Sequence, residues 1–346
     1  MKPRIFIIGI GGRTGSMFAR ELQGVCDIVG VGLEREKEAV NRGGIKIQRN
    51  NNGIAKPLEV EAILAPDFGA AIEKKYPDFI WLAVKNPVAP AVKFYYSQFK
   101  GKEKIPALVL SQNGLLAISD AQTALNDALG QDADKIRIIR VSLSNGIDLR
   151  VDEAAYAPAG ATASQSGTFI ISYKIPIKLG FGAIVGKATD IKEILQAARI
   201  KAQEFKGADV YKMENSKLFT NLIGMASATC GLTVSAGLRD KKTFEQEIAI
   251  LKEYVSAVKA SGGGFVDNFA GYPIKMLAEM VLLPTALLVP FRGIFERIVS
   301  KGRSRPKDLS EIDYYNGEAV KLGQAVGVPT PVNEEIIRRA KAEKTI

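Results

Sequence analysis

The sequence predicts an α/β domain built on a parallel sheet, followed by a mainly α-helical domain. Three observations carry this prediction. The first fifteen residues run from an apolar, strand-like segment through a glycine cluster into a helix-forming segment. Buried-type strands that end in polar residues then recur, which is the pattern of an open parallel sheet. After Gly207 the hydrophobic pattern is helical almost to the C-terminus, so we place the two domains at 1–206 and 207–346.

The turn after the first strand has the composition of a nucleotide-binding turn. The apolar residues 4–8 lead into a segment that reads Gly9, Ile10, Gly11, Gly12, Arg13, Thr14 and Gly15. Glycines let the backbone approach a pyrophosphate, and the free N–H groups at a helix start favour an anion. We therefore predict a Rossmann-type domain in which this segment binds a dinucleotide. A glycine cluster that only marks a tight turn is the alternative.

The sequence leaves the register of this turn open. Gly9 and Gly11 match the first two positions of the G-x-G-x-x-G pattern, but its third glycine position holds Thr14. Gly9, Gly12 and Gly15 form a second spacing, G-x-x-G-x-x-G. The two registers place the close approach to the phosphates at different residues.

The end of the second predicted strand, residues 27–33, is where such a domain selects its cofactor. A carboxylate there accepts hydrogen bonds from the adenosine ribose of NAD, whereas an arginine pairs with the 2′-phosphate of NADP. Here Glu34 and Arg35 stand side by side. Glu34 favours NAD and Arg35 favours NADP, so both cofactors stay open, as does a solvated charge cluster that binds neither.

Polar residues follow two further predicted strands. Residues 78–84 form a buried-type strand that stops at Lys85, and residues 107–110 form another that ends shortly before Asn113. Because ligands bind at the carboxyl ends of parallel strands, we expect cofactor and substrate to meet at Lys85 and Asn113. Between the second strand and these two, residues 45–60 indicate a hairpin or loop.

The last third of the first domain changes its pattern. Between residues 136 and 184, short strand-like runs such as 138–142 and 169–173 are separated by Gly, Ala and Ser. We expect these runs to extend the sheet. Residues 191–205 are expected to form an amphipathic helix.

Neither membrane insertion nor export is expected. The apolar stretch 276–295 contains Glu279, Pro284, Pro290 and Arg292, and such residues are costly in a helix that crosses a bilayer. We expect a buried helix of the second domain that is broken at proline. The N-terminus leads straight into a strand without a secretory leader, which favours a cytoplasmic protein.

The amino-acid composition excludes several classes of catalytic and metal-binding site. The 346 residues include no histidine, which excludes a histidine-dependent dehydrogenase, a Ser-His-Asp hydrolase and a histidine-ligated metal centre. Cys26 and Cys230 are too few for a disulfide framework or a zinc site, and both stand in apolar surroundings that suit buried thiols in a reducing compartment. The formal charge of +10 is spread along the chain, which favours a solvated basic surface over nucleic-acid binding.

One lysine has a setting that suits proton transfer. Lys217 and Asn221 are four residues apart in a segment with helical periodicity, so they share one helix face beside apolar residues. A partly buried ammonium beside an amide can give a proton to a carbonyl oxygen that gains negative charge. On spacing alone, a solvated lysine is the commoner case.

Two C-terminal segments carry a family resemblance. Residues 310–317, Ser-Glu-Ile-Asp-Tyr-Tyr-Asn-Gly, followed by residues 327–333, Gly-Val-Pro-Thr-Pro-Val-Asn, resemble the C-terminal signature of the ketopantoate reductase family, the 2-dehydropantoate 2-reductases. The resemblance continues in residues 112–114, Gln-Asn-Gly, in the strand end at Lys85 and in the lysine and asparagine pair described above. It covers most of the chain in the same order.

The resemblance implies an NAD(P)H-dependent reductase of a 2-oxo acid. Its active site would lie between a Rossmann-type domain and an all-α domain like that of 6-phosphogluconate dehydrogenases. Lys217 would protonate the ketone oxygen as hydride arrives from the nicotinamide. Asn113 and Asn221 would hold substrate or cofactor, Lys85 would lie near the cofactor, and Glu311 would accept a hydrogen bond from the substrate hydroxyl. NADP is the expected cofactor and NAD the alternative.

Differences from the family pattern keep the substrate open. Residues 295–300 lack the asparagine and the Ser-Ser-Met pattern that precede the Glu-Ile-Asp segment in the family, and residues 302–311 are longer than usual. Met225 stands where a second helix asparagine is expected. The alternatives are a reductase of a different 2-oxo acid and a non-catalytic nucleotide-sensing protein. Family members often form homodimers through the helical domain, and residues 276–295 are the expected interface.

Overall fold

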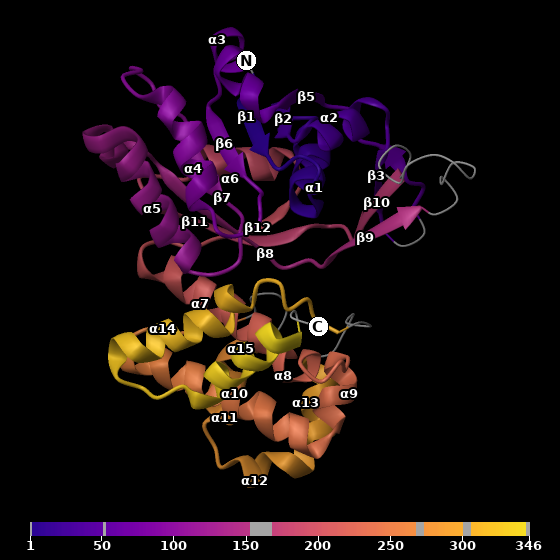
Figure 1. The fold of residues 1–346 in the computed structure, drawn as a ribbon, viewed down its shortest axis with the longest axis vertical. Coiled ribbons are helices and arrows are strands. Elements are labelled where there is room, and N and C mark those ends of the chain that lie inside the picture. The colour runs from indigo at the N-terminus through magenta and orange to yellow at the C-terminus, as the bar shows by residue number, and fades with distance from the viewer. Residues whose placement is uncertain (1, 51–52, 153–167, 268–272, 300–305, 344–346) are drawn as a thin grey trace. The chain divides into compact units, whose positions relative to one another are not determined.

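The computed structural model describes residues 2–50, 53–152, 168–267, 273–299 and 306–343. The chain divides into two compact units (Figure 1). The first comprises residues 1–112 and 117–207, and the second comprises residues 113–116 and 208–346. The first unit is α/β and the second is helical, which confirms the predicted fold class.

An eight-stranded sheet forms the centre of the first unit. The six strands from β8 to β5 are parallel to one another, whereas β11 and β12 run in the opposite direction. Since β1 has β2 on one side and β6 on the other, the strand order reverses beside β1, where open parallel sheets bind ligands. In spatial order the strands are β12 (Lys201–Glu204), β11 (Lys178–Val185), β8 (Ile138–Leu143), β7 (Ala107–Leu110), β6 (Phe79–Leu82), β1 (Arg4–Ile8), β2 (Asp27–Gly32) and β5 (Glu61–Leu64).

Helices cover both faces of this sheet, which explains why β1 and β6 are almost entirely apolar and buried. On one face the ring of Phe18 contacts that of Trp81, with centroids 4.4 Å apart. On the other face Phe68 lies edge-on to Phe6 at 5.7 Å. The helices of this unit are α1 (Arg13–Leu22), α2 (Glu34–Asn41), α3 (Phe68–Lys74), α4 (Ala89–Tyr96), α5 (Leu116–Leu129) and α6 (Thr189–Ala197).

A second sheet of four strands belongs to the same unit, in the order β4 (Lys56–Pro57), β3 (Ile45–Arg49), β10 (Thr168–Tyr173) and β9 (Ile147–Asp152). Residues 45–60 were expected to form a hairpin or a loop, and the antiparallel pairing of β3 and β4 shows that they contain a hairpin. The prediction that residues 169–173 extend the main sheet is wrong, because β10 pairs with β3 and β9. The predicted strand at residues 138–142 does extend the main sheet, as β8.

Residues 191–205 form a helix and a strand, so the prediction of one amphipathic helix is correct only for the first half. α6 ends at Ala197, and Arg199 then adopts a φ of 58°, which a helix cannot contain. The chain continues as β12, which pairs with β11 at the edge of the sheet. Its side chains alternate between exposed and half-buried, as in a strand with one covered face.

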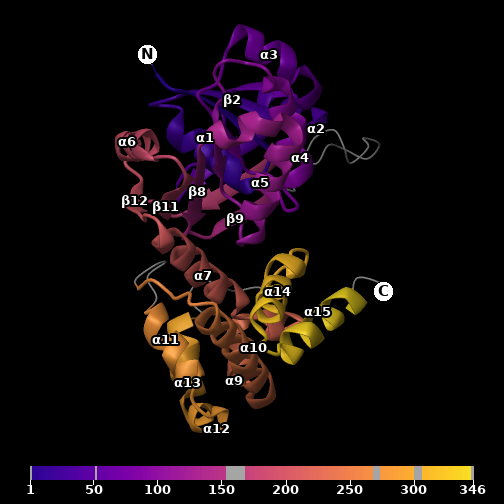
Figure 2. The same ribbon diagram turned by 90° about the vertical axis from the view of Figure 1, so that its left-hand side faces the viewer.

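The second unit is organised around α10 (Lys241–Ala260). The Asp240 side chain caps this helix by accepting the Thr243 N–H at 2.8 Å. The turned view shows α10 among its neighbours, and it contacts α7, α9, α11, α14 and α15 (Figure 2). Its buried apolar residues recur at helical spacing: Phe244, Ile248, Leu251, Val255 and Val258. The other helices are α7 (Ala208–Leu222), α8 (Met225–Ala228), α9 (Val234–Arg239), α11 (Ile274–Val281), α12 (Thr285–Leu288), α13 (Arg292–Val299), η7 (Ile312–Tyr314), α14 (Asn316–Val326) and α15 (Pro331–Glu343).

The apolar stretch 276–295 is divided among α11, α12 and α13. Pro284 separates the first two helices, and Pro290 lies before the third, so the predicted break at proline is confirmed. The expected full burial is wrong, because five apolar side chains are between 47% and 59% exposed: Met276, Leu283, Leu287, Phe291 and Ile294. Across the ranges described, no helix has the length and apolar character needed to cross a membrane.

The two cysteines differ in their environments, and both are free thiols. Burial raises the pKa of Cys26 to about 11. Cys230 is exposed, so the expectation of a buried thiol is wrong there. It lies in the turn after α8, between the buried Ala228 and the half-buried Leu232.

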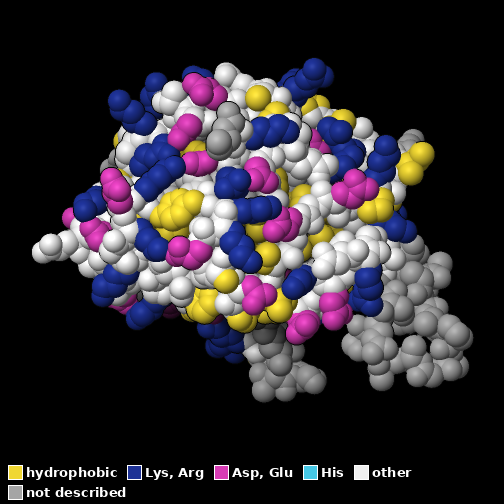
Figure 3. Space-filling model, turned by 90° about the horizontal axis from the view of Figure 1, so that it is seen from above, with side chains coloured by type: hydrophobic (Ala, Val, Ile, Leu, Met, Phe, Trp, Pro, Cys, Tyr) yellow, Lys and Arg dark blue, Asp and Glu magenta, His cyan; other side chains and the backbone are white. Residues whose placement is uncertain are grey.

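Charged side chains on the face seen in Figure 3 are mixed in sign. Lysine and arginine side chains are spread over this face and are interspersed with aspartate and glutamate. Nucleic-acid binding proteins instead gather positive charge into a patch or stripe. This face therefore has the character of a solvated, mildly basic surface.

Candidate active site

The turn between β1 and α1 fits the G-x-x-G-x-x-G register of Gly9, Gly12 and Gly15, because Gly9 and Gly15 are the glycines that approach each other. Gly9 has a φ of 87°, a left-handed conformation that favours glycine, and its N–H donates to the Val31 carbonyl at 2.9 Å. Gly15 lies in the first turn of α1, so close to β1 that an added methyl group would collide with the Gly9 carbonyl oxygen. Gly9 and Gly15 thus supply the tight turn and the close helix–strand approach of a dinucleotide-binding turn.

The N-terminus of α1 suits an anion. Gly12 is the N-cap residue and offers no side chain to the first N–H groups, and the first turn contains no acidic residue. Those N–H groups have no partner within the helix, and the helix dipole favours negative charge there. Arg13 and Thr14 begin the helix, and the exposed Arg13 side chain donates to the Ile147 carbonyl at 3.5 Å. These residues fit a pyrophosphate.

The chain that leads to Lys85 runs against the glycine turn. An added methyl group on Gly9 would lie 3.2 Å from a methyl carbon of Val84. The Gln112 side chain, which follows β7, donates to the carbonyls of Leu82 at 2.9 Å and Val84 at 3.1 Å. The structure therefore gathers the ends of β1, β6 and β7, as predicted, while the Lys85 side chain itself is exposed.

A buried arginine holds the end of β7. Arg140 of β8 is fully buried, and its guanidinium donates to the carbonyl oxygens of Leu110 at 3.3 Å and of Gln112. A buried cation is costly unless it is hydrogen-bonded, and these two bonds hold the backbone just before Asn113. Arg140 is not among the predicted site residues, because its sequence signal is only a charge inside an apolar strand.

Two carboxylates follow the end of β2, those of Glu34 and Glu36, and they differ in burial. Glu34 and Arg35 are the first two residues of α2, and both are exposed. Glu36 is half-buried, and its Oε2 accepts the backbone N–H of Leu33 at 2.9 Å. The sequence signal for this contact is a glutamate three residues after a helix N-cap, which is a known capping pattern.

In the second unit, Lys217 and Asn221 lie on α7, four residues apart and half-buried, as predicted. Glu214, three residues before Lys217, is only 1% exposed. Met225 does not lie one turn further along the same helix, because α7 ends at Leu222 and Met225 begins α8. Met225 is fully buried.

Tyr315 joins two of the predicted substrate-binding residues. Asn113 Nδ2 donates to the Tyr315 hydroxyl at 3.1 Å, and this hydroxyl donates to Glu311 Oε2 at 3.0 Å. Burial, together with the adjacent Glu311 carboxylate, raises the pKa of Tyr315, so the phenol keeps its proton. Tyr315 is not among the predicted site residues, and its sequence signal is its place in the C-terminal signature.

Lys307 links the C-terminal signature to α7. Its Nζ donates to the backbone carbonyls of Thr220 at 3.5 Å and of Asn221, and a helix C-terminus favours a cation. Lys307 lies four residues before Glu311. Through these bonds the structure brings the segments that carry Asn221, Glu311 and Asn113 into one cluster of the second unit.

The segment that departs from the family pattern is described only in part. Ser300 and residues 302–305 lie outside the described residues. Residues 295–299 end α13, where Phe295 is buried and Glu296 Oε1 accepts the Ser235 hydroxyl at 2.5 Å. Glu296 therefore ties α13 to α9.

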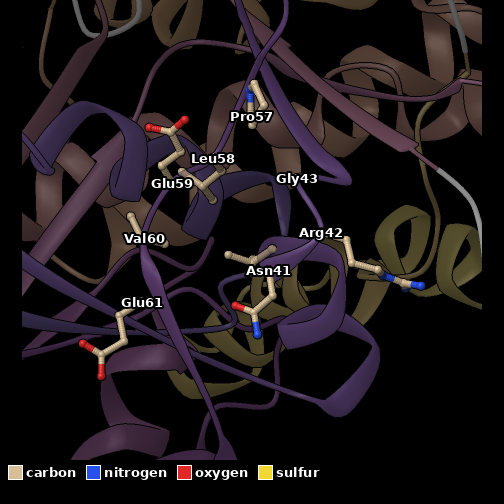
Figure 4. Close-up of a pocket in the computed structure, with 9 residues that line it drawn as sticks. Asn41, Arg42, Gly43, Pro57, Leu58, Glu59, Val60 and Glu61 are labelled. Atoms are coloured by element: carbon tan, nitrogen blue, oxygen red, sulfur yellow. The ribbon is translucent and has the colours of Figure 1, made fainter.

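A hollow of about 590 Å³ on the first unit contains none of the predicted site residues. Residues 40–43 and 57–61 line it (Figure 4). The polar ends of Asn41, Arg42 and Glu59 point in different directions, so they do not converge on one ligand. In the part of the chain that the structure describes, no group of three or more Cys, Asp or Glu side chains is placed to hold a metal ion.

The C-terminal region matches a known family. A family model described as ketopantoate reductase PanE/ApbA C terminal matches residues 209–344. A curated 2-dehydropantoate 2-reductase from Pyrobaculum aerophilum is 33% identical over 86 residues, which represent 21% of this chain and 31% of that protein. The chain thus matches about a third of the length of this relative.

Solved structures share the fold over nearly the whole chain. The structure of D-mandelate dehydrogenase with NADH and anilino(oxo)acetate is 13% identical with a TM-score of 0.68, and the match covers 99% of this chain and 98% of that one. The 2-dehydropantoate 2-reductase from Methylococcus capsulatus is 18% identical with a TM-score of 0.66, covering 99% and 97%. At these identities the likeness establishes the fold.

The close approach at Gly15 predicts a loss of stability for Gly15→Ala. The added methyl group collides with a backbone carbonyl of Gly9, and overpacking of this kind costs about 1–3 kcal/mol. Urea unfolding measures the difference. Gly24→Ala is the matched control, because open space surrounds that residue. A Gly15→Ala variant as stable as the wild type would contradict the described approach.

Removal of the Tyr315 hydroxyl is expected to lower the stability of the protein. Tyr315→Phe leaves Asn113 Nδ2 and Glu311 Oε2 without the hydroxyl that they share, which should cost about 1–3 kcal/mol. Tyr211→Phe, at a residue that is 46% exposed on α7, should change stability little. Equal unfolding midpoints for the two variants would show that the hydroxyl bridge is absent in solution.

Proposed function

Because the chain belongs to the ketopantoate reductase family, we propose that it reduces a 2-oxo acid with hydride from a reduced nicotinamide cofactor. The observation that carries this proposal is that the family match, residues 209–344, contains Lys217, Asn221 and Glu311. The glycine turn of the first unit supports it from the cofactor side. The first substrate to test is 2-dehydropantoate, whose reduction gives pantoate for pantothenate synthesis.

The cofactor is proposed to bind at the glycine turn. When bound, a reduced nicotinamide supplies the hydride. The backbone from Gly9 to Gly15 and the N-terminus of α1 would hold the pyrophosphate. Lys85, at the end of β6, would lie near the cofactor. NADPH and NADH both satisfy this chemistry, because they carry the same nicotinamide.

Lys217 is the proposed general acid. A chain without histidine needs another proton donor, and a half-buried ammonium can transfer its proton to the ketone oxygen as negative charge develops there. Asn221 lies one helical turn further on and would hold the same substrate. Glu311, oriented by the Tyr315 hydroxyl at 3.0 Å, would accept a hydrogen bond from the substrate hydroxyl. Asn113 would complete the substrate contacts.

A different 2-oxo acid is the second candidate substrate. The fold matches that of a D-mandelate dehydrogenase solved with an oxoacetate as closely as that of a 2-dehydropantoate 2-reductase. A panel of 2-oxo acids, screened for oxidation of NADH and NADPH, separates the two substrates. Turnover of none of them, with cofactor bound, would favour the nucleotide-sensing alternative.

We also propose a cytoplasmic homodimer. The two free cysteines suit a reducing compartment. The exposed apolar side chains on α11, α12 and α13 would form the dimer interface, because contiguous exposed apolar surface is a mark of protein–protein contact.

Replacement of Lys217 tests the proposed mechanism. Lys217→Ala should lower kcat by about 10²-fold or more, since it removes the proton donor. Lys212→Ala on the same helix is the control, because Lys212 forms an ion pair with Asp209 at 2.8 Å and has no proposed role. Steady-state assays with the best substrate of the panel give the comparison. Near-normal turnover by Lys217→Ala would eliminate the assigned role.

Charge on the proposed interface tests the dimer. Leu287→Asp and Ile294→Asp each place a carboxylate among exposed apolar side chains, at residues that are 59% and 57% exposed. Sedimentation at micromolar concentration should show the wild type as a dimer and both variants shifted to monomer. Ile54→Asp, at a residue 83% exposed on the first unit, should remain dimeric. A monomeric wild type, or dimeric interface variants, would refute this interface.

A further inference from the structure

We propose that Glu36, in place of Glu34 or Arg35, binds the adenosine ribose of the cofactor and makes the protein prefer NADH to NADPH. This inference rests on the proposed function, because it names the cofactor of the same site. It assigns a selecting role to a residue that the sequence pattern did not indicate.

Glu36 lies at the carboxyl end of β2. Its Oε2 accepts the Leu33 N–H at 2.9 Å, which folds the side chain back over the strand end. An added methyl group on Gly32, the last residue of β2, would lie 2.5 Å from that same oxygen. A dinucleotide-binding domain places the acceptor for the ribose hydroxyls at this strand end.

The Glu36 side chain also contacts the glycine turn. An added methyl group on Gly11 would lie 2.5 Å from Glu36 Cγ and 2.8 Å from its carboxyl carbon. The turn is itself tied to β2, because the N–H groups of Gly9 and Ile10 both donate to the Val31 carbonyl. The carboxylate therefore lies where the proposed pyrophosphate site meets the end of β2, which is the position of an adenosine ribose.

The charge of Glu36 is not neutralised by a neighbouring cation. Within the described ranges, no lysine or arginine forms an ion pair with it, and Oε1 makes no hydrogen bond. Its field reaches the buried Tyr95, whose pKa is raised to about 12 by burial and also by the Glu36 carboxylate. The site therefore has negative potential and a free acceptor oxygen.

This environment distinguishes the two cofactors. The 2′- and 3′-hydroxyls of the NADH ribose can donate to a carboxylate in charge-assisted hydrogen bonds. The 2′-phosphate of NADPH has no proton to donate at neutral pH in its dianionic form and is repelled by the same carboxylate. Hydrogen bonds to charged groups of this kind correspond to a difference of about tenfold to a hundredfold in affinity.

Arg35 is poorly placed to offset this repulsion. It is exposed on the first turn of α2, and it directly precedes Glu36. Successive residues of a helix do not face the same side. We therefore assign the ribose contact to Glu36 and not to Arg35.

Direct binding measurements on the full chain test the inference. Calorimetric titration of the wild type with NADH and with NADPH should give an affinity at least about tenfold higher for NADH. Glu36→Gln keeps an acceptor oxygen for the Leu33 N–H and removes the charge, so NADH should bind more weakly and NADPH more tightly. Glu38→Gln, at an exposed residue of the same helix, should leave the affinity ratio unchanged. Thermal unfolding without cofactor shows whether each variant is folded.

The outcomes separate the two proposals. A wild type that binds both cofactors but prefers NADPH, or a folded Glu36→Gln variant with an unchanged ratio, overturns the role of Glu36 and leaves the reductase proposal intact. A selective loss of NADPH binding in Arg35→Ala would also overturn it, because it would assign the selection to Arg35. Failure of the wild type to bind either cofactor would instead overturn the proposed function.

Discussion

The close approach of α1 to β1 is the constraint on which the first unit depends. Only a residue without a side chain can stand at Gly15, since a methyl group there meets the Gly9 carbonyl oxygen. This contact fixes the N-terminus of α1 at the edge of the sheet where β1, β6 and β7 end. The same helix then covers the sheet through Phe18, whose ring contacts Trp81 at 4.4 Å. One backbone contact thus sets both the anion-binding position and part of the core.

Local sequence signals predicted where strands and helices lie better than they predicted which strands pair with each other. The strand at residues 169–173 was identified, but its pairing with β3 joins residues more than a hundred positions apart, and strand periodicity contains no information about that choice. The break after α6 was missed because Arg199 adopts a positive φ. The residue type arginine does not predict a positive φ, whereas glycine does, so the turn at Gly9 was predictable from the sequence.

In the candidate site, too, relations between residues close in sequence were predicted, and contacts between distant residues were not. Lys217 and Asn221 were predicted to share a helix face, because their relation depends only on a spacing of four residues. The roles of Tyr315 and Arg140 depend on long-range contacts: the bond from Asn113 to Tyr315 spans 202 residues of sequence, and that from Arg140 to Leu110 spans 30. Glu36, to which we assign the ribose contact, is a different case, because Glu34 stands nearer to the end of β2 in the sequence and the folding back of Glu36 onto the Leu33 N–H is not visible there.

Asn113, one of the proposed substrate-binding residues, is held in place by bonds to its side chain and to the backbone on either side of it. Its amide is bonded to the Tyr315 hydroxyl, while Glu318 accepts the N–H groups of Leu115 at 2.7 Å and Leu116 at 2.9 Å. On the other side, Arg140 binds the Gln112 carbonyl. A polar group whose backbone is fixed in this way needs no reorganisation when charge develops on a substrate, which is the condition under which a hydrogen-bond donor contributes most to catalysis.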